Sequence, residues 1–399
     1  MHSPKFRGVL VASLLGVNLT ASSSQTLPSP ALDISDRYIV TLKPNIDLTQ
    51  HLNFIQALHQ KTFANEEGGA LFEGLSHNWT IQSFKAYAGH FPPAIVEQLE
   101  AHQDVANVEA DQIINTAGLV IQKDTAYNLN FISHKSIDAS NSGYVYDSSA
   151  GADTFAYVID TGIDTAHKEF QGRAIFGYNA LKDKDNRDYP GHGTKVAGII
   201  GSKTYGVAKK CHLVAVKVFD GRRGVATHVI DGYNWAYHDI IRKDLEAVAV
   251  ISMSVDGGDY SKALNDAIDS ASKEGVLTVV AAGNHGQDVS KVWTTKSAII
   301  VGGTGKTRTA VPQSNYGKSV TLFAPGVDIP TTGLQNSVTS FSGTSASAPH
   351  VSGLLLYFMG QRRMTSTAAK KKLIQVALKN VVKSTRGSPN LFAYNDSGK

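Results

Sequence analysis

The chain has 399 residues, of which 42% are hydrophobic, a size and composition that suit two or three globular domains. Its 38 Lys and Arg against 34 Asp and Glu give a formal net charge of +4. Both signs are scattered along the sequence, so we expect no nucleic-acid partner. The single cysteine, Cys211, excludes an intrachain disulfide and any zinc site built from several cysteines.

The N-terminus carries the pattern of a secretory signal. Lys5 and Arg7 precede an apolar run over residues 8–17, and small residues follow over 21–24. The run is shorter than the roughly 20 apolar residues that cross a bilayer, and no other stretch reaches that length. We therefore expect a signal peptide over residues 1–21, a secreted, extracellular protein and no membrane span. Export would make Asn78 and Asn395, each in an Asn-X-Ser/Thr tripeptide, glycosylation acceptors.

The segment over residues 37–117 predicts a small α+β domain. An apolar strand over residues 38–42 precedes a helical pattern over 48–63, and a second strand lies around 81–87. Pro92-Pro93 opens a second helix, and a last strand covers 105–114. The stretch over 118–150 is rich in Ser, Asn, Asp and Tyr, which indicates a boundary or an irregular arm.

From residue 154 onward, apolar runs of strand length alternate with helical patterns. The strands are expected at 155–159, 213–218, 247–251, 276–281 and 299–301, and the helices at 192–201, 226–242, 261–274, 345–360 and 366–378. Such alternation predicts an α/β fold, with a mainly parallel sheet covered on both faces. Functional residues in such sheets gather beyond the carboxyl ends of the strands.

Three polar residues at the ends of these elements stand out: Asp160, His192 and Ser345. Each could instead have a purely structural role: Asp160 as a turn former, His192 as part of a glycine turn and Ser345 as a helix cap. Together they suit acyl transfer, because a nucleophilic serine needs a base and a carboxylate to orient that base. The order Asp, His, Ser differs from that of α/β-hydrolases, and no G-x-S-x-G motif surrounds Ser345.

On these residues the chain resembles the subtilisin-like serine proteases, and within them the fungal secreted enzymes of the proteinase K type. Residues 343–353 read G-T-S-A-S-A-P-H-V-S-G, where the family has a sequence close to G-T-S-M-A-x-P-H-V-A-G. Further likeness lies at 158–164, 191–198, 213–218, 252–258, 281–284, 314–317 and 323–326. The resemblance implies a subtilisin-like three-layer fold and a broad-specificity endopeptidase.

The leading module resembles the family's inhibitory propeptide. This likeness implies a propeptide over residues 22–118, with its domain core at about 37–117, and a peptidase domain over 119–399. The propeptide would act as an intramolecular inhibitor, and the chain would cut itself between about Thr116 and Gln122.

The resemblance also implies roles for single residues. Ser345 is expected as nucleophile, His192 as general base and then acid, and Asp160 as the group that orients and stabilises the imidazolium. Asn284 matches the oxyanion-hole asparagine, although a turn residue would also suit its position. The expected substrate-binding residues are Ser254, Val255, Asp256, Gly257, Ala281, Ala282 and Gly283. The substrates would be proteins and peptides, and the chemistry needs no cofactor.

The sequence departs from the family pattern at several positions. Lys195 replaces a second histidine, which predicts altered packing or local charge. Asp256 stands in place of a glycine, where it would narrow the cleft, favour a cationic substrate group or point to solvent. Residues 300–305 offer no carboxylate, so the family's calcium site there looks lost, while other calcium sites stay open and no metal ligands are assigned. Cys211 is expected to be a packing residue.

Two other function classes stay open. A catalytically impaired relative would keep the fold and act as a binding or surface protein, without processing itself. A different hydrolase, such as an esterase, would use the same serine, although a peptide-lined cleft and a propeptide argue against it. A monomer is the default expectation.

Overall fold

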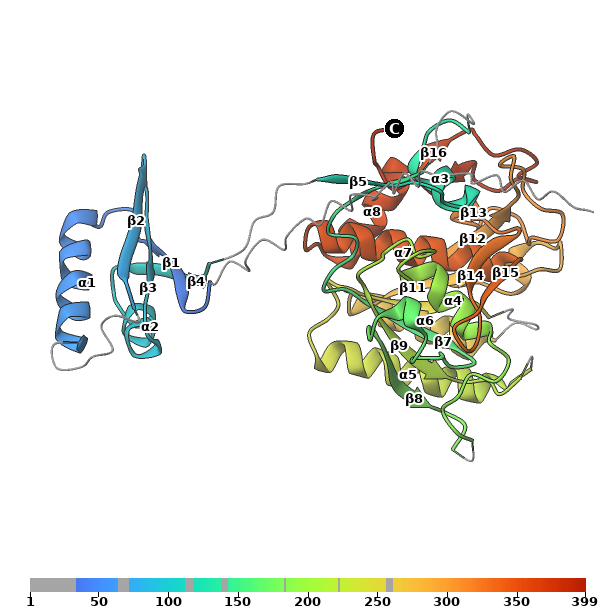
Figure 1. Ribbon diagram of the computed structural model, residues 1–399, viewed down its shortest axis with the longest axis horizontal. Helices are drawn as coiled ribbons and strands as arrows, with labels where there is room; N and C mark the ends of the chain where they lie inside the picture. The colour runs from blue at the N-terminus through green and yellow to red at the C-terminus, as the bar shows by residue number, and fades with distance from the viewer. Residues whose placement is uncertain are drawn as a thin grey trace, which may run out of the picture. The chain divides into compact units, whose positions relative to one another are not determined.

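The computed structural model describes residues 34–63, 72–111, 118–137, 143–182, 184–221, 223–255 and 261–399. The chain divides into two compact units, Met1–Thr116 and Ala117–Lys399, here called the N-terminal and C-terminal units (Figure 1). The predicted signal peptide, Asp256 and Gly257 lie outside the described residues. No helix in the described segments is long and apolar enough to span a membrane.

The N-terminal unit is a four-stranded antiparallel sheet with two helices. Its elements are β1 (Arg37–Leu42), α1 (Leu48–Phe63), β2 (Gly74–Ile81), β3 (Phe84–His90), α2 (Pro93–Glu100) and β4 (Val105–Ala110), with strand order β2-β3-β1-β4. Val40 and Leu42, two residues apart, share one face of β1 and lie in a single core with Ile55 of α1 and Leu99 of α2. Both helices therefore cover the same face of the sheet.

The predicted single strand around residues 81–87 is wrong, because the chain forms a hairpin of two strands there. β2 and β3 pair from Gly74 opposite His90 to Ile81 opposite Phe84. β2 lies at the edge of the sheet, and its residues after Leu75 are exposed. A strand with no buried side shows no alternation of apolar and polar residues, which is why the sequence pattern missed it.

The C-terminal unit is built on a nine-stranded sheet whose order is β16-β17-β13-β12-β11-β10-β7-β9-β8. The strands are β7 (Phe155–Asp160), β8 (Ala174–Asn179), β9 (His212–Lys217), β10 (Ala249–Met253), β11 (Leu277–Ala281), β12 (Ile299–Thr304), β13 (Leu322–Pro325), β16 (Leu378–Lys379) and β17 (Leu391–Phe392). All neighbouring pairs are parallel except β16 and β17. This sheet confirms the predicted α/β fold.

Helices cover both faces of this sheet. They are α4 (His192–Gly201), α5 (Ala226–Arg242), α6 (Lys262–Lys273), α7 (Thr344–Gln361) and α8 (Ser366–Val376) (Figure 1). Gly232 of α5 lies against Val216 and Val218, whereas Gly201 of α4 lies against Leu213. Because side chains alternate along a strand, α5 and α4 pack on opposite faces. α7 is buried from Thr344 to Met359, as a central helix must be.

The stretch over 118–150, expected to be a boundary or an irregular arm, contains regular elements. These are β5 (Leu119–Gln122), α3 (Tyr127–Ser133) and β6 (Tyr144–Asp147), and β5 pairs with β6. Asn128 of α3 is 1% exposed, and its Nδ2 donates to His350 Nε2 at 2.9 Å. A helix that buries hydrogen-bonded polar side chains gives a weak hydrophobic period. A further hairpin joins β14 (Ile329–Thr332) and β15 (Val338–Phe341).

Candidate active site

Asp160 and His192 meet at the carboxyl edge of the large sheet. Asp160 is the last residue of β7 and is 1% exposed, while His192 is the first residue of α4. Gly191, with φ of 72°, precedes the helix in the left-handed region that favours glycine. His192 Nδ1 donates to Asp160 Oδ1 at 2.7 Å. This bond leaves Nε2 as the nitrogen that can exchange a proton with another group.

A second buried carboxylate, Asp188, fixes the start of α4. Its Oδ2 accepts from the N–H and hydroxyl of Thr194 at 2.8 and 2.6 Å, and its Oδ1 accepts from Gly191 N–H and the Thr161 hydroxyl. Asp188 therefore satisfies backbone donors at the helix N-terminus and ties the helix to the residue after Asp160. Sequence reasoning missed Asp188. Its only signal was an acidic residue shortly before a helix, which is a common pattern.

Lys217 is another residue that the sequence did not single out. It is the last residue of β9 and is fully buried, and its Nζ donates to Thr161 O at 3.1 Å, Arg187 O at 2.8 Å and Asp220 Oδ1 at 3.0 Å. The buried ammonium thus has three oxygen acceptors. It holds together the loop after Asp160 and the loop before His192.

Burial, carboxylates and one lysine set the proton affinity of His192. Burial lowers its pKa, but the negative charges of Asp160 and Asp188 outweigh this effect, and the net pKa is raised above the ordinary value. The positive charge of Lys195 opposes the rise. Lys195 Nζ lies 5.7 Å from the centre of the Phe341 ring, whose centre lies 5.2 Å from that of the His192 ring.

Ser345 lies at the N-terminus of α7, where backbone N–H groups have no intrahelical acceptor. Its side chain is 8% exposed, and its hydroxyl donates to Ser254 O at 3.1 Å, while the Ser254 hydroxyl donates to Ser345 O at 3.0 Å. Ser254 follows β10, the strand beside β7. In this structure the hydroxyl of Ser345 is thus directed at Ser254 and not at His192.

Asn284 is placed beside the start of α7 by its own side chain. Its Oδ1 accepts from the backbone N–H of Thr344 at 2.8 Å and from the Thr344 hydroxyl at 3.1 Å. A Cβ on Gly343, where φ is 115°, would lie 3.2 Å from the same oxygen. Both Oδ1 bonds are made to Thr344, and no hydrogen bond of the Asn284 Nδ2 donor is found among the described residues.

The predicted substrate-binding residues fall into two groups. Ala281 ends β11, Ala282 and Gly283 follow it, and all three are buried. Ser254 and Val255 follow β10 and are 2% and 8% exposed. The strands that carry these two groups at their carboxyl ends, β10 and β11, are neighbours in the sheet. Asp256 and Gly257, the remaining two residues, lie outside the described residues.

The two glycosylation predictions differ in outcome. Asn78 is exposed on β2, so its site stays a prediction. The prediction for Asn395 is wrong in this fold, because the residue is 1% exposed and its Nδ2 donates to Val145 O at 2.7 Å. The tripeptide pattern carries no information on burial.

Cys211 is fully buried, and burial raises the pKa of its thiol to about 12. The thiol is therefore protonated at neutral pH and suits the packing role expected from the sequence.

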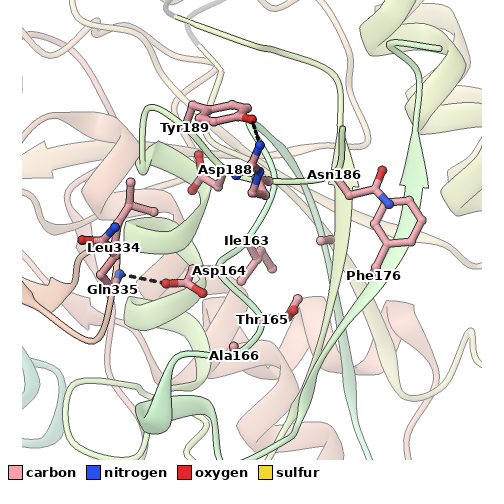
Figure 2. A pocket seen from close by; sticks show the side chains of 12 residues that line it. Ile163, Asp164, Thr165, Ala166, Phe176, Asn186, Asp188, Tyr189, Leu334 and Gln335 are labelled. Atoms are coloured by element: carbon pink, nitrogen blue, oxygen red, sulfur yellow. Dashed lines mark hydrogen bonds between the residues drawn. The ribbon is translucent and has the colours of Figure 1, made fainter. Parts of the chain in front are cut away.

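A cavity of about 470 Å³ lies between the loop after Asp160 and the loop before His192 (Figure 2). Its lining includes Asp164, Phe176, Tyr189 and Leu334, but neither His192 nor Ser345. Asp164 Oδ2 already accepts from the backbone N–H of Gln335 at 2.9 Å. The cavity is therefore separate from the candidate catalytic groups.

Two protein-family models match this chain. The model of the subtilase family matches residues 151–394. The chain belongs to the subtilase family. The model of the peptidase inhibitor I9 family matches residues 37–117, which cover the described N-terminal unit.

Individual relatives agree with the family assignment. The chain is 43% identical to Alkaline protease 1 of Aspergillus clavatus over 405 residues, covering 99% of each chain. It is 38% identical to the Alkaline proteinase of Hapsidospora chrysogena, covering 97% of this chain and 98% of that one. A crystal structure of a cold-adapted subtilisin-like serine proteinase matches with a TM-score of 0.63 and 33% identity, covering 68% of this chain and 98% of that chain. The subtilase is thus a serine endopeptidase with an I9 propeptide domain.

Proposed function

We propose that this subtilase hydrolyses peptide bonds through Asp160, His192 and Ser345. The observation that carries the proposal is the 2.7 Å bond from His192 Nδ1 to Asp160, at the sheet edge where Ser345 opens α7. The bond fixes the imidazole tautomer with Nε2 unprotonated, as a general base requires. Asn284 and the backbone N–H of Ser345 are the donors for a tetrahedral oxyanion.

The mechanism starts when a peptide carbonyl enters the cleft. Ser345 turns its hydroxyl from Ser254 O to His192 Nε2, gives up its proton there and attacks the carbonyl carbon. Contacts of this kind are often loose without substrate and tighten when it binds. The Asp160 carboxylate stabilises the imidazolium, which then protonates the leaving amine. Water activated by His192 hydrolyses the acyl-enzyme and restores Ser345.

The small residues Ala281, Ala282 and Gly283 support broad specificity, because they let a peptide backbone lie close and leave room for varied side chains. The substrates are accordingly proteins and peptides, and the enzyme acts as a monomer. No cofactor takes part in the chemistry. A direct binding measurement would test for structural calcium.

The maturation scheme follows from the two units. Residues 1–21 direct export, residues 22–118 inhibit the protease until it cuts itself, and residues 119–399 form the extracellular mature enzyme. The division of the described chain near residue 116 and the I9 match support this scheme.

A serine-directed reagent tests the proposed nucleophile. The parent chain, Ser345→Ala and Ser347→Ala are treated with a fluorophosphonate probe and assayed on casein. Ser347 lies two residues away on the same helix and is fully buried, so it serves as the matched control. Label and activity are expected in the parent and in Ser347→Ala, and neither in Ser345→Ala. A folded parent that takes no label and leaves casein intact would support the impaired relative instead.

A further inference from the structure

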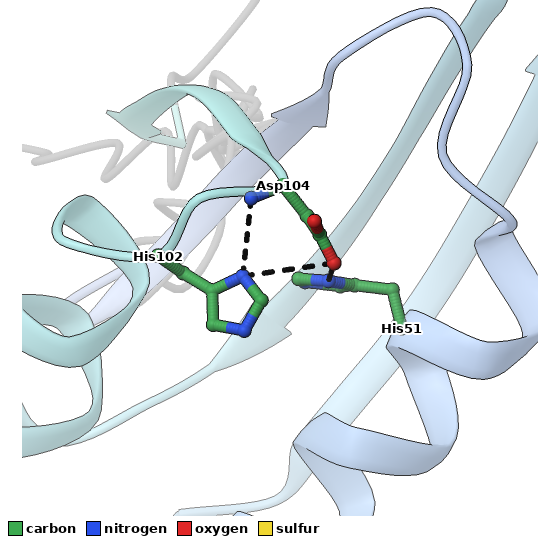
Figure 3. Close-up of side chains that lie close together, drawn as sticks. All are labelled: His51, His102 and Asp104. Carbon is green, nitrogen blue, oxygen red and sulfur yellow. Dashed lines mark hydrogen bonds and ion pairs between the residues drawn. The ribbon is translucent and has the colours of Figure 1, made fainter.

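Two histidines and an aspartate form a cluster in the N-terminal unit, away from the protease residues. His51 comes from the second turn of α1, and His102 and Asp104 come from the turn between α2 and β4. Figure 3 shows the Asp104 carboxylate pointing toward both imidazole rings. The three candidate ligand atoms lie within 4.8 Å of one another. Among the described residues, no other group of three or more His, Cys, Asp or Glu is arranged to hold a metal ion.

The contacts in this cluster are long for hydrogen bonds. Asp104 Oδ2 lies 3.5 Å from His51 Nδ1, at the outer limit of a hydrogen bond, and 3.8 Å from His102 Nδ1. Hydrogen bonds between such atoms usually span about 2.7–3.2 Å. Two ligands of a tetrahedral Zn²⁺ ion, each about 2.0–2.1 Å from the metal, lie about 3.3 Å apart. A small closure of the turn toward α1 would give these separations.

The second nitrogen of His51 supports a ligand role for Nδ1. Its Nε2 lies 3.2 Å from the hydroxyl of Tyr87, which is fully buried on β3. In the tautomer in which Nε2–H donates to that oxygen, the lone pair of Nδ1 faces Asp104. Metal-binding histidines are typically held by such a bond from the other ring nitrogen.

His102 Nδ1 also carries no proton, because the backbone N–H of Asp104 donates to it at 3.2 Å. An ion bound here would replace that N–H as the partner of the Nδ1 lone pair. The side chains of His102 and Asp104 are 23% and 26% exposed, whereas that of His51 is fully buried. The cluster is thus anchored on its inner side and open to solvent on its outer side. An ion can enter there, and a water molecule can complete four-fold coordination.

From this geometry we infer that His51, His102 and Asp104 form a binding site for one Zn²⁺ ion, which joins α1 to the turn between α2 and β4. Two imidazole nitrogens and one carboxylate oxygen are ligands that zinc accepts, and Ca²⁺ and Mg²⁺ prefer oxygen ligands. An ion bound only to the folded unit stabilises it against unfolding. The site does not depend on the proposed protease chemistry.

The test uses the full chain with Ser345→Ala, so that the N-terminal unit stays attached. Zn²⁺ binding is measured by competition with a chromogenic chelator, and Co²⁺ is added as a spectroscopic probe of coordination. One Zn²⁺ per chain and a visible Co²⁺ band typical of four-coordinate sites are expected. Zn²⁺ should also raise the unfolding temperature of the transition that belongs to the N-terminal unit.

Variants then locate the site. His102→Ala and Asp104→Asn change partly exposed side chains, so they should fold, and each should weaken Zn²⁺ binding by at least about tenfold. Tyr87→Phe keeps the ring and removes the hydroxyl, with an expected loss of about 10–100-fold. His77→Ala is the matched control, because His77 is an exposed histidine on β2 of the same unit. It should bind Zn²⁺ as the parent does.

Two results would overturn the inference. The first is a parent chain that takes up no stoichiometric Zn²⁺. The second is His102→Ala and Asp104→Asn variants that bind Zn²⁺ as tightly as the parent, which would place the ion on other histidines among the 14 of the chain.

Discussion

Burial lowers the pKa of His192, whereas the carboxylates of Asp160 and Asp188 raise it. Its raised pKa means that the imidazole is still protonated somewhat above the ordinary value of 6.5. In the proposed mechanism only the neutral ring accepts the proton of Ser345, so we expect activity to rise with pH through the pKa of His192. We therefore expect higher activity under neutral and alkaline conditions than under acidic ones.

We expect Lys195 to tune this pH profile. A nearby cation disfavours the imidazolium, so Lys195→Met should raise the pKa of His192 and move the rising limb of kcat/KM upward by about 0.3–0.5 pH unit at low salt. Added salt should reduce the shift. Lys273→Met, at the exposed end of α6, is the control and should leave the profile unchanged. A limb that stays in place or moves to lower pH in Lys195→Met would show that Lys195 does not act on His192.

In the proposed mechanism Asn284 acts through the oxyanion. Replacing it by alanine removes the Nδ2 donor, so kcat on a peptide substrate should fall by about 10²–10³-fold. KM should change little, because the bond forms mainly in the transition state. Steady-state kinetics on a chromogenic peptide measure both, and circular dichroism checks that the loop after β11 still folds. A loss confined to KM would assign Asn284 to substrate binding instead.

At the scale of elements, the start of α4 is held by a carboxylate that takes no part in proton transfer. Asp188 accepts two backbone N–H groups and two hydroxyls within a buried turn. In Asp188→Ala the N–H groups of Gly191 and Thr194 lose their acceptor, at a cost of about 1–3 kcal/mol each. Denaturant unfolding in a Ser345→Ala background should therefore show a clear loss of stability.

Asp185 provides the comparison for Asp188. It is an exposed residue of the same loop that pairs with Arg187 at the surface, and exposed ion pairs contribute little. Asp185→Ala should unfold at the same denaturant concentration as its background. Equal stability of the two alanine variants would mean that Asp188 is not needed to hold α4.

The sequence predicted best the elements whose side chains follow a simple period. The five strands β7, β9, β10, β11 and β12 and the helices α4 to α8 lie close to their predicted ranges, because buried strands and amphipathic helices leave clear patterns. β2 was missed because its residues are mostly exposed. Asp188 and Lys217 were missed because buried charges become recognisable only when folding brings their distant partners together.

The positions of the proposed catalytic residues were predictable because each ends or begins a regular element. Asp160 ends β7, and His192 and Ser345 lie in the first turns of α4 and α7. The direction of the Ser345 hydroxyl toward Ser254 was not predictable, since hydroxyl rotation depends on neighbours that lie far away in the sequence. The same holds for the buried environment of Asn395.

At the scale of the whole molecule, the chain joins two units of different kinds. One matches an inhibitor family and the other the subtilase family, and the relatives cover both units in one polypeptide. A protease made with its own inhibitor must separate from it to act on other proteins. We therefore propose that Ser345 cuts the link between the two units.

Self-processing tests this claim most directly. Residues 22–399 are expressed as the parent sequence, as Ser345→Ala and as the neighbouring Ser347→Ala control, and the products are followed over time by size and N-terminal sequencing. The parent and Ser347→Ala should release a mature chain that begins between about residues 116 and 122, while Ser345→Ala stays full length. Equal cleavage of Ser345→Ala, or a folded parent that remains intact, would contradict the account.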